Sequence, residues 1–232
     1  MRLHELAFGC RIYGGLTGYD SSLARLRTAT GGDIDPNNAE HQKVLFKWLN
    51  DWGCRQFSTA HHATVAAPSL VAWAAQWLAT LPAVDAELQD LDQTQIDGIG
   101  KAYAALRSQL AGTRTLRSGA TSDVEYGPVG SAKTLFALRP NICPPWDAYT
   151  LAKLGFDQSA TSYSQYMQRV LSDLQGVAAQ AGVEVSELPA VIGRPESTPP
   201  KLIDEYYWVT ITRGFTPASR DELVTWLAWA DL

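Results

Sequence analysis

Cysteine is scarce in this sequence, and long apolar runs are missing. The 232 residues include three cysteines, Cys10, Cys54 and Cys143, which lie far apart. Their number and spacing provide neither a disulfide framework nor a set of metal ligands, and they fit a reducing compartment. No apolar run approaches the roughly 18 to 20 residues that cross a bilayer, and no secretory leader opens the chain. We therefore expect a cytoplasmic protein with no membrane partner, no metal and no other cofactor.

Basic residues are fewer than acidic ones, with 19 lysines and arginines against 24 aspartates and glutamates. Charged residues make up 19% of the chain against 46% hydrophobic residues, which is typical of a globular protein, and the net charge is −5. That balance argues against a nucleic-acid partner, but the charge is unevenly distributed. Residues 101–153 hold seven lysines and arginines and three acidic residues, a net charge of +4, whereas the rest of the chain carries −9. The basic segment is either a face for phosphate groups or an ordinary fluctuation.

Apolar residues recur at helical spacing through most of the chain, so we expect an all-α fold. The segment YYWVTIT (206–212) has strand-like composition, but the flanking PPKLIDE favours a helix there. Helices are predicted over residues 36–52, 69–81, 94–110, 162–181 and 219–230. We expect one monomeric unit over residues 1–232, in which residues 94–160 would form one helical subdomain and residues 1–93 with 161–232 the other.

A glycine-rich segment interrupts the helical pattern between the third and fourth predicted helices. Residues 126–135 read YGPVGSAKTL, which predicts a tight turn at 127–130 and a short helix from Ser131. Such a turn presents consecutive backbone N–H groups and a helix N-terminus to a phosphate, and a nearby lysine adds positive charge. The predicted phosphate-binding residues are Gly127, Val129, Gly130, Ser131, Ala132 and Lys133.

A single carboxylate follows this turn after an apolar run. Asp147 stands behind Pro144, Pro145 and Trp146, at the expected start of the next helix. The dipole of that helix favours the ionised carboxylate, while burial beside Trp146 opposes it. Asp147 is therefore either a helix cap, a common role for aspartate, or a catalytic carboxylate, and one residue can serve as both.

GPVGSAKTL resembles the second half of the helix-hairpin-helix motif of the base-excision DNA glycosylases, whose usual form is PGVG-x-K-T-A. In that family an apolar helix and then an aspartate follow the hairpin, which corresponds here to Asp147 in PPWD. Weaker similarity, over about residues 40–175, extends to a helix–loop–helix that carries the duplex-wedging residue and to an I-x-x-I-x-x-x-Y helix. The resemblance implies an all-α glycosylase bundle with a cleft, and DNA as the partner.

The chain departs from the family pattern at the lysine. With Gly130 aligned to the second glycine of the motif, the lysine position falls on Ala132, and Lys133 comes one residue late. Either the turn holds an extra residue, or the lysine of the lyase-competent members is absent, which would make the enzyme monofunctional. The path from Gly130 to Asp147 is also shorter than usual, and the four-cysteine iron–sulfur loop is missing.

The resemblance implies that the protein flips a modified or damaged base out of DNA and cleaves its N-glycosidic bond to leave an abasic site. Asp147 would stabilise the oxocarbenium-like transition state. Lys133 is the second catalytic candidate, with a phosphate-facing or solvated lysine as the alternative. Oxidised purines, mismatched pyrimidines and the hypermodified cytosines of phage DNA, which would imply phage defence, all stay open as substrates. Two other classes of function stay open. The protein is then either a non-catalytic helix-hairpin-helix module that only binds DNA, or a helical interaction protein.

Aromatic residues and two histidines are candidates for contact with a flipped base or with the duplex. The histidines lie between two predicted helices, in a position suited to a wedge or to an ordinary polar loop. The aromatic residues could stack on a base or belong to the core. The candidates are His61, His62, Tyr13, Tyr19, Trp146 and Trp208.

Overall fold

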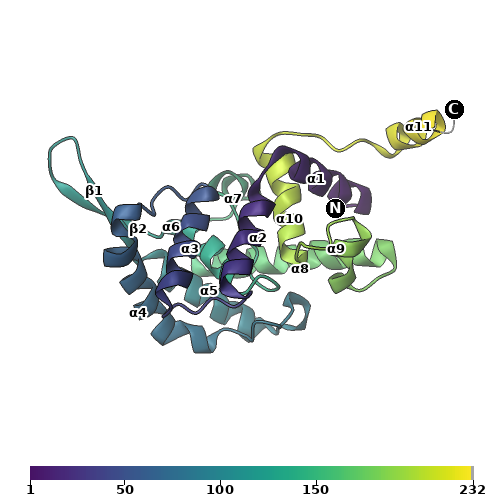
Figure 1. The fold of residues 1–232 in the computed structure, drawn as a ribbon. Helices are drawn as coiled ribbons and strands as arrows, with labels where there is room; N and C mark the ends of the chain where they lie inside the picture. Colours follow the sequence, from purple (N-terminus) through teal and green to yellow (C-terminus); the bar gives the residue numbers. More distant parts are fainter. Residues whose placement is uncertain (231–232) are drawn as a thin grey trace.

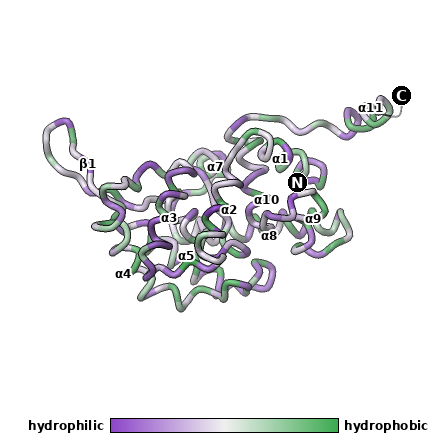
Figure 2. The backbone as a smooth tube through the Cα atoms, in the orientation of Figure 1, coloured by the Kyte–Doolittle hydropathy of each residue, from purple (hydrophilic) through white to green (hydrophobic). Residues whose placement is uncertain are grey.

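Helices form most of the computed structural model, which describes residues 1–230 (Figure 1). Hydrophobic and hydrophilic residues alternate along them (Figure 2), as expected for amphipathic helices around a shared core. The α-helices are α1 (Leu3–Leu16), α2 (Tyr19–Thr30), α3 (Ala39–Asp51), α4 (Ala67–Trp77), α5 (Gln93–Arg107), α6 (Gly127–Leu138), α7 (Ala148–Leu154), α8 (Ala160–Ala181), α9 (Leu188–Val191), α10 (Pro199–Tyr207) and α11 (Arg220–Ala230). None of the helices in this part of the chain is long and apolar enough to cross a membrane.

The predicted all-α class is confirmed, and the helices predicted from periodicity correspond to α3, α4, α5, α8 and α11. The segment 206–212 is helical, as its flanks indicated: α10 runs into a π-helical turn at Trp208–Thr212. Sequence patterning missed α1 and α2. The glycines and tyrosines of GCRIYGGLTGYD obscured the helical spacing of buried residues such as Leu6, Cys10 and Leu23.

A two-stranded β-ribbon separates α5 from α6, where the sequence predicts a helix as far as residue 110 and a tight turn at 127–130 but no strand. Strands β1 (Leu110–Thr115) and β2 (Thr121–Glu125) pair antiparallel, with Thr113 opposite Asp123. Threonine suits a strand, and the turn between the strands contains Gly119, whose φ of 81° favours glycine. The ribbon extends away from the helical body in Figure 1.

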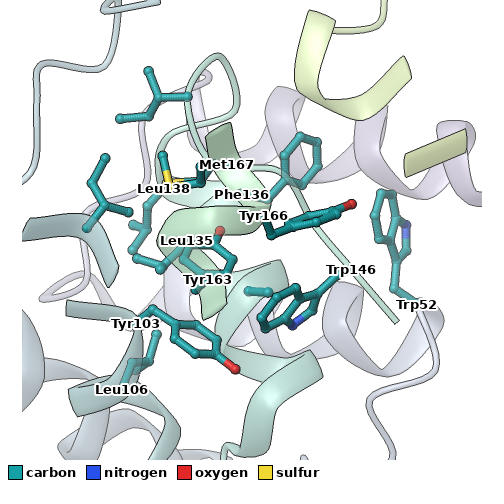
Figure 3. Close-up of a cluster of buried hydrophobic side chains, with 14 of the residues drawn as sticks. Trp52, Tyr103, Leu106, Leu135, Phe136, Leu138, Trp146, Tyr163, Tyr166 and Met167 are labelled. Atoms are coloured by element: carbon teal, nitrogen blue, oxygen red, sulfur yellow. The ribbon is translucent and has the colours of Figure 1, made fainter. Parts of the chain in front are cut away.

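An aromatic cluster lies at the centre of the core (Figure 3). The rings of Tyr103 and Tyr163 stack with their centroids 4.4 Å apart, and Trp146 meets Tyr163 edge-on at 5.0 Å. Tyr166 adds a fourth ring, 5.2 Å from Trp146. The cluster joins α5 and α8 to the loop that carries Trp146, so it fixes the loop that ends at Asp147.

Helices α5 and α8 approach each other closely at Gly100. A Cβ atom at that position would lie 2.6 Å from the carbonyl oxygen of Ala160 and 2.3 Å from Ser164 Oγ. The Ser164 hydroxyl instead donates to the carbonyl of Ile96, at 3.2 Å. The short interhelical distance brings Tyr103 of α5 against Tyr163 of α8.

Helix α11 lies apart from the body at the end of an extended segment (Figure 1). Its apolar side chains are largely exposed, with 59% of Val224 and 67% of Leu227 accessible to solvent. This helix does not contribute to the core cluster, which runs from Leu6 to Tyr207.

We expect Gly130→Ala to destabilise the fold through overpacking. Gly130 is buried, and a Cβ there would lie 2.6 Å from Gln56 Nε2 and 3.1 Å from Phe57 Cε2. Overpacking of this kind lowers the free energy of unfolding by about 1–3 kcal/mol, which urea titration would measure. Gly98→Ala is the matched control, because a Cβ at that helical position meets no atom within 4 Å. Equal stability of the two variants would contradict this account of α6 packing.

Candidate functional site

Asp147 is held in place from both sides. The loop before it is anchored by hydrogen bonds from Tyr163 to the Pro144 carbonyl (3.1 Å) and from Tyr166 to the Pro145 carbonyl (3.2 Å). Trp146 donates through Nε1 to the carbonyl of Pro128 in α6, at 3.1 Å. These three bonds fix the backbone leading to the carboxylate.

Both carboxylate oxygens of Asp147 accept a hydrogen bond. Oδ1 accepts from the backbone N–H of Thr150 at 2.7 Å, which makes Asp147 the N-cap of α7, as the sequence indicated. Oδ2 accepts from the hydroxyl of Thr212 at 2.7 Å, and that hydroxyl lies 3.3 Å from Thr150 Oγ1. The cap therefore does not use the whole carboxylate, and the side chain also lines a cavity.

Lys133 lies on the same cavity, whereas Ala132 does not. Lys133 Nζ donates to the carbonyl oxygen of Trp52 at 2.6 Å and lies 5.6 Å from the centroid of the Trp52 ring. Ala132 is fully buried in the core. Lys133 therefore shares the cavity with Asp147, and it is not the freely solvated lysine that the sequence left open.

Aromatic rings line the cavity. Tyr13 lies 5.5 Å from Trp208, edge to face, and Tyr19 lies 6.2 Å from Tyr13 and 5.8 Å from Trp52. The Trp52 ring is oriented by a hydrogen bond from Nε1 to Ser22 Oγ, at 2.9 Å. The walls thus combine residues from the N-terminal helices, the end of α3 and the π-helical turn after α10.

The cavity has a volume of about 350 Å³. It unites residues that stand far apart in the sequence and that the sequence pattern had proposed for three different roles. Its lining includes Tyr13, Tyr19, Trp52, Val129, Lys133, Trp146, Asp147, Asp204, Trp208 and Thr212. Of the predicted aromatic candidates, Tyr19 and Trp208 are partly exposed at the cavity, while Tyr13 and Trp146 also line it but are 2% and 1% exposed and belong mainly to the core.

Asp204 brings a second carboxylate into the cavity. Burial raises the pKa of Asp204 to about 7, and repulsion from the Asp147 carboxylate adds to the effect, while Lys133 and Lys201 act against it. Its side chain makes no hydrogen bond to any other described residue and faces the cavity. The cavity therefore holds two carboxyl groups in different environments, Asp147 with a hydrogen bond to each oxygen and Asp204 with a raised pKa.

Buried ion pairs along α10 hold this helix in position. Lys201 pairs with Glu205 and, at 2.7 Å, with Asp20 of α2. Arg194 bridges Asp20 at 2.5 Å and Glu205 at 2.9 Å. Lys201 and Glu205 are each at most 1% exposed, so removing one partner would leave an uncompensated charge in the interior. The network fixes α10, and with it Asp204, against α2.

The predicted glycine turn proves to be the first turn of α6. Gly127 has the positive φ of 65° expected for a turn glycine, but Gly130 has an ordinary helical backbone and is buried under Phe57. Ser131 and Ala132 are fully buried, so their side chains cannot contact DNA. Of the six predicted phosphate-binding residues, only Gly127, Val129 and Lys133 are partly exposed.

The two histidines lie away from the cavity. His61 packs under the ribbon, where the Thr113 N–H donates to its Nδ1 at 3.4 Å. His62 Nε2 lies 3.0 Å from the Phe57 carbonyl, and its ring packs 5.2 Å from that of Phe46. Neither residue lines the base-sized cavity, so the predicted pocket role does not fit their positions.

Sequence reasoning missed Trp52, Asp204 and Thr212 as cavity residues. Trp52 fitted the apolar face of its helix, and its ring does pack against the core, so no sequence signal separated it from other core residues. Asp204 and Trp208 are one helical turn apart, which places a carboxylate and a ring on the same face. That spacing is the signal available in the sequence, because the flanking PPKLIDE favours a helix through this segment.

No group of acidic, histidine or cysteine residues within the described chain could hold a metal ion. Comparison with family models, curated proteins and solved structures gave no match for this chain. The function is therefore argued from the cavity itself.

The raised pKa of Asp204 predicts a pH-dependent effect on stability. Between about pH 4 and pH 7 the folded protein keeps a proton on Asp204 that the unfolded chain, with a carboxyl pKa of 3.8, releases. Wild-type stability should therefore fall through this range relative to Asp204→Asn, which carries no ionisable group. We expect the two proteins to be equally stable near pH 4 and the variant to be more stable at pH 8 by about 1 kcal/mol or more.

Urea unfolding at several pH values would measure this difference. Asp123→Asn, an exposed position on β2, is the control and should show a difference from wild type that does not change with pH. A wild-type protein at least as stable as Asp204→Asn at pH 8 would contradict the raised pKa.

Proposed function

We propose that this protein is a DNA N-glycosylase that accepts a flipped base in the aromatic cavity and releases it to leave an abasic site. The observation that carries the proposal is the convergence of Lys133, Asp147 and aromatic walls on one cavity. The sequence indicates these residues on separate grounds: the hairpin motif indicates Lys133 and Asp147, and the ability of aromatic rings to stack on a base indicates Tyr13, Tyr19 and Trp208. Their meeting in one place supports a common function.

The shape and lining of the cavity suit a nucleobase. Its volume of about 350 Å³ lies at the lower end of the roughly 300–1,000 Å³ found for small-molecule pockets. Aromatic side chains stack on the faces of extruded bases, and Tyr19 and Trp208, which are partly exposed at the cavity, would offer such faces. A module that only grips the DNA backbone would need none of these features, which favours the enzyme over the non-catalytic alternative.

The acidic residues supply the chemistry that N-glycosidic cleavage requires. As the bond from the sugar C1′ to the base breaks, positive charge develops on the sugar, and a fixed carboxylate beside it stabilises that charge. A water molecule then adds at C1′ and gives up a proton, which leaves the abasic site, and the departing base takes up a proton. Asp147 is fixed by the bonds from Thr150 and Thr212, so it needs no reorganisation when the charge develops. Asp204, with its proton retained near neutrality, would donate a hydrogen bond to an acceptor atom of the departing base.

The substrate base is best identified with a panel of duplexes. Each duplex would carry one central oxidised purine, mismatched pyrimidine or glucosylated hydroxymethylcytosine, and alkali after incubation would reveal abasic sites. We expect strand cleavage after alkali for one class of base. No abasic sites in any duplex would count against the glycosylase.

Asp147→Asn should lower base release by orders of magnitude with little change in stability. Asparagine caps helices well and nearly preserves size, but it lacks the negative charge that stabilises the transition state. Single-turnover excision and thermal melting of the same variant would be measured together. Asp92→Asn is the matched control, because Asp92 caps α5 in the same way, accepting from the Gln95 N–H at 2.8 Å, and lies outside the cavity. Full excision by a stable Asp147→Asn protein would end this assignment.

We expect a monofunctional enzyme, with Lys133 as a binding residue and not a Schiff-base nucleophile. Lys133 Nζ is engaged by the Trp52 carbonyl, and attack on the sugar would require that bond to break. Borohydride added during excision should therefore trap no covalent protein–DNA adduct, and strands should break only after alkali. An adduct that forms with the wild type and with Lys153→Ala, but not with Lys133→Ala, would instead identify Lys133 as the nucleophile.

A further inference from the structure

The outer half of the β-ribbon packs against nothing in the described chain. Residues 114–121 are exposed on both faces of the ribbon. A free two-stranded ribbon is at best marginally stable in water, because it buries little apolar surface. The projection of such a ribbon from the helical body therefore points to a binding partner for its outer half.

The chemistry of this outer half is that of a phosphate-binding surface. Arg114 and Arg117 form no ion pair with any described residue, and Ser118, Thr121 and Ser122 add hydroxyl donors. No carboxylate occurs between Thr113 and Ser122, so the acidic residues of β2 are confined to the end nearest the body. Arginine together with serine and threonine hydroxyls is the usual set of protein donors to DNA phosphates.

The inner end of the ribbon is tied firmly to the protein. Tyr126 donates from its N–H to the Gln109 carbonyl at 2.8 Å and from its hydroxyl to the Ala66 carbonyl at 2.8 Å. Gln56 donates to the Tyr126 carbonyl at 2.7 Å, and Ala111 is fully buried. The ribbon is therefore a projection with a fixed base.

The ribbon leads directly into the wall of the cavity. Its second strand ends two residues before α6, and Val129 and Lys133 of α6 line the cavity. A partner bound to the ribbon is therefore held at a defined position relative to the proposed base pocket.

The dimensions of the ribbon match a groove of double-stranded DNA. Strands rise about 3.3 Å per residue, so the four steps from Gly112 to Leu116 reach about 13 Å from the body. The major groove of B-DNA is about 8.5 Å deep and about 12 Å wide and admits a two-stranded ribbon. Leu116 stands at the tip between the two arginines and is 40% exposed.

We propose that the outer half of the ribbon, residues 114–121, inserts into a groove of duplex DNA beside the flipped nucleotide, with Arg114 and Arg117 on the phosphates. This proposal rests on the proposed function for its partner, DNA. The contacts are to the backbone, so the ribbon contributes affinity and placement without selecting sequence.

The test measures how binding to duplex DNA depends on salt, with a duplex that contains no base for the enzyme to release. The probe is a labelled duplex with a central tetrahydrofuran abasic-site analogue, bound by the full-length protein. Each phosphate contact contributes about 0.9 to the slope of log affinity against log salt. Arg114→Ala/Arg117→Ala should reduce that slope by about 1 to 2 and weaken binding at least about tenfold, similarly on duplexes of different sequence.

Two comparisons isolate the ribbon from net charge. Arg11→Ala/Arg220→Ala removes the same charge from α1 and α11, which lie at the opposite end of the molecule in Figure 1, and should keep the wild-type slope. Arg114→Lys/Arg117→Lys keeps the charge and should retain most of the slope. Thermal melting checks that each variant is folded.

The outcomes separate this proposal from the proposed function. An unchanged slope in a folded Arg114→Ala/Arg117→Ala protein, or an equal loss in the Arg11→Ala/Arg220→Ala control, overturns the ribbon proposal even if the wild type excises a base. A ribbon-dependent slope in a protein that releases no base supports the ribbon and counts against the glycosylase. A wild type that does not bind the duplex overturns the ribbon proposal outright.

Discussion

The loop Pro144–Trp146 is the constraint on which the site depends. Two tyrosines of α8 donate to its proline carbonyls, and Trp146 donates into the first turn of α6. The loop therefore joins the helix that carries Lys133 to the helix that Asp147 caps. Because the tyrosines and the tryptophan also form the aromatic cluster of the core, the position of the carboxylate is set by buried, closely packed rings.

The charged side chains of α10 differ in how they are paired. Lys201 and Glu205 are buried within an ion network that includes Asp20 and Arg194. Asp204, three residues after Lys201, forms no ion pair with a described residue and lines the cavity together with Asp147. Burial and repulsion from Asp147 raise the pKa of Asp204 to about 7, because an unpaired carboxyl group in such surroundings favours its neutral form.

Local patterns predicted α3, α4, α5, α8, α11 and the cap at Asp147, because helix periodicity and capping depend on residues close in sequence, but they missed α1 and α2. They did not predict the β-ribbon, whose short threonine-containing strands lack an alternating apolar face. The motif located Lys133 and Asp147, but the packing of Phe57 against Gly130, which makes 127–130 a helical turn, is a tertiary contact. Asp204 and Thr212 reach the site because the chain after α8 folds back against the first helices. Helical periodicity cannot predict such a contact between distant segments.

The cavity is assembled from both ends of the described chain. Tyr13 and Tyr19 come from the first two helices, whereas Trp208 and Thr212 come from the turn after α10, and they meet around Asp147. During synthesis, the aromatic wall and the second hydrogen bond to Asp147 cannot form until the segment through Thr212 has left the ribosome. A chain that ends before α10 therefore exposes the faces of Tyr13 and Tyr19 that Trp208 later covers, and such exposed apolar surface favours aggregation.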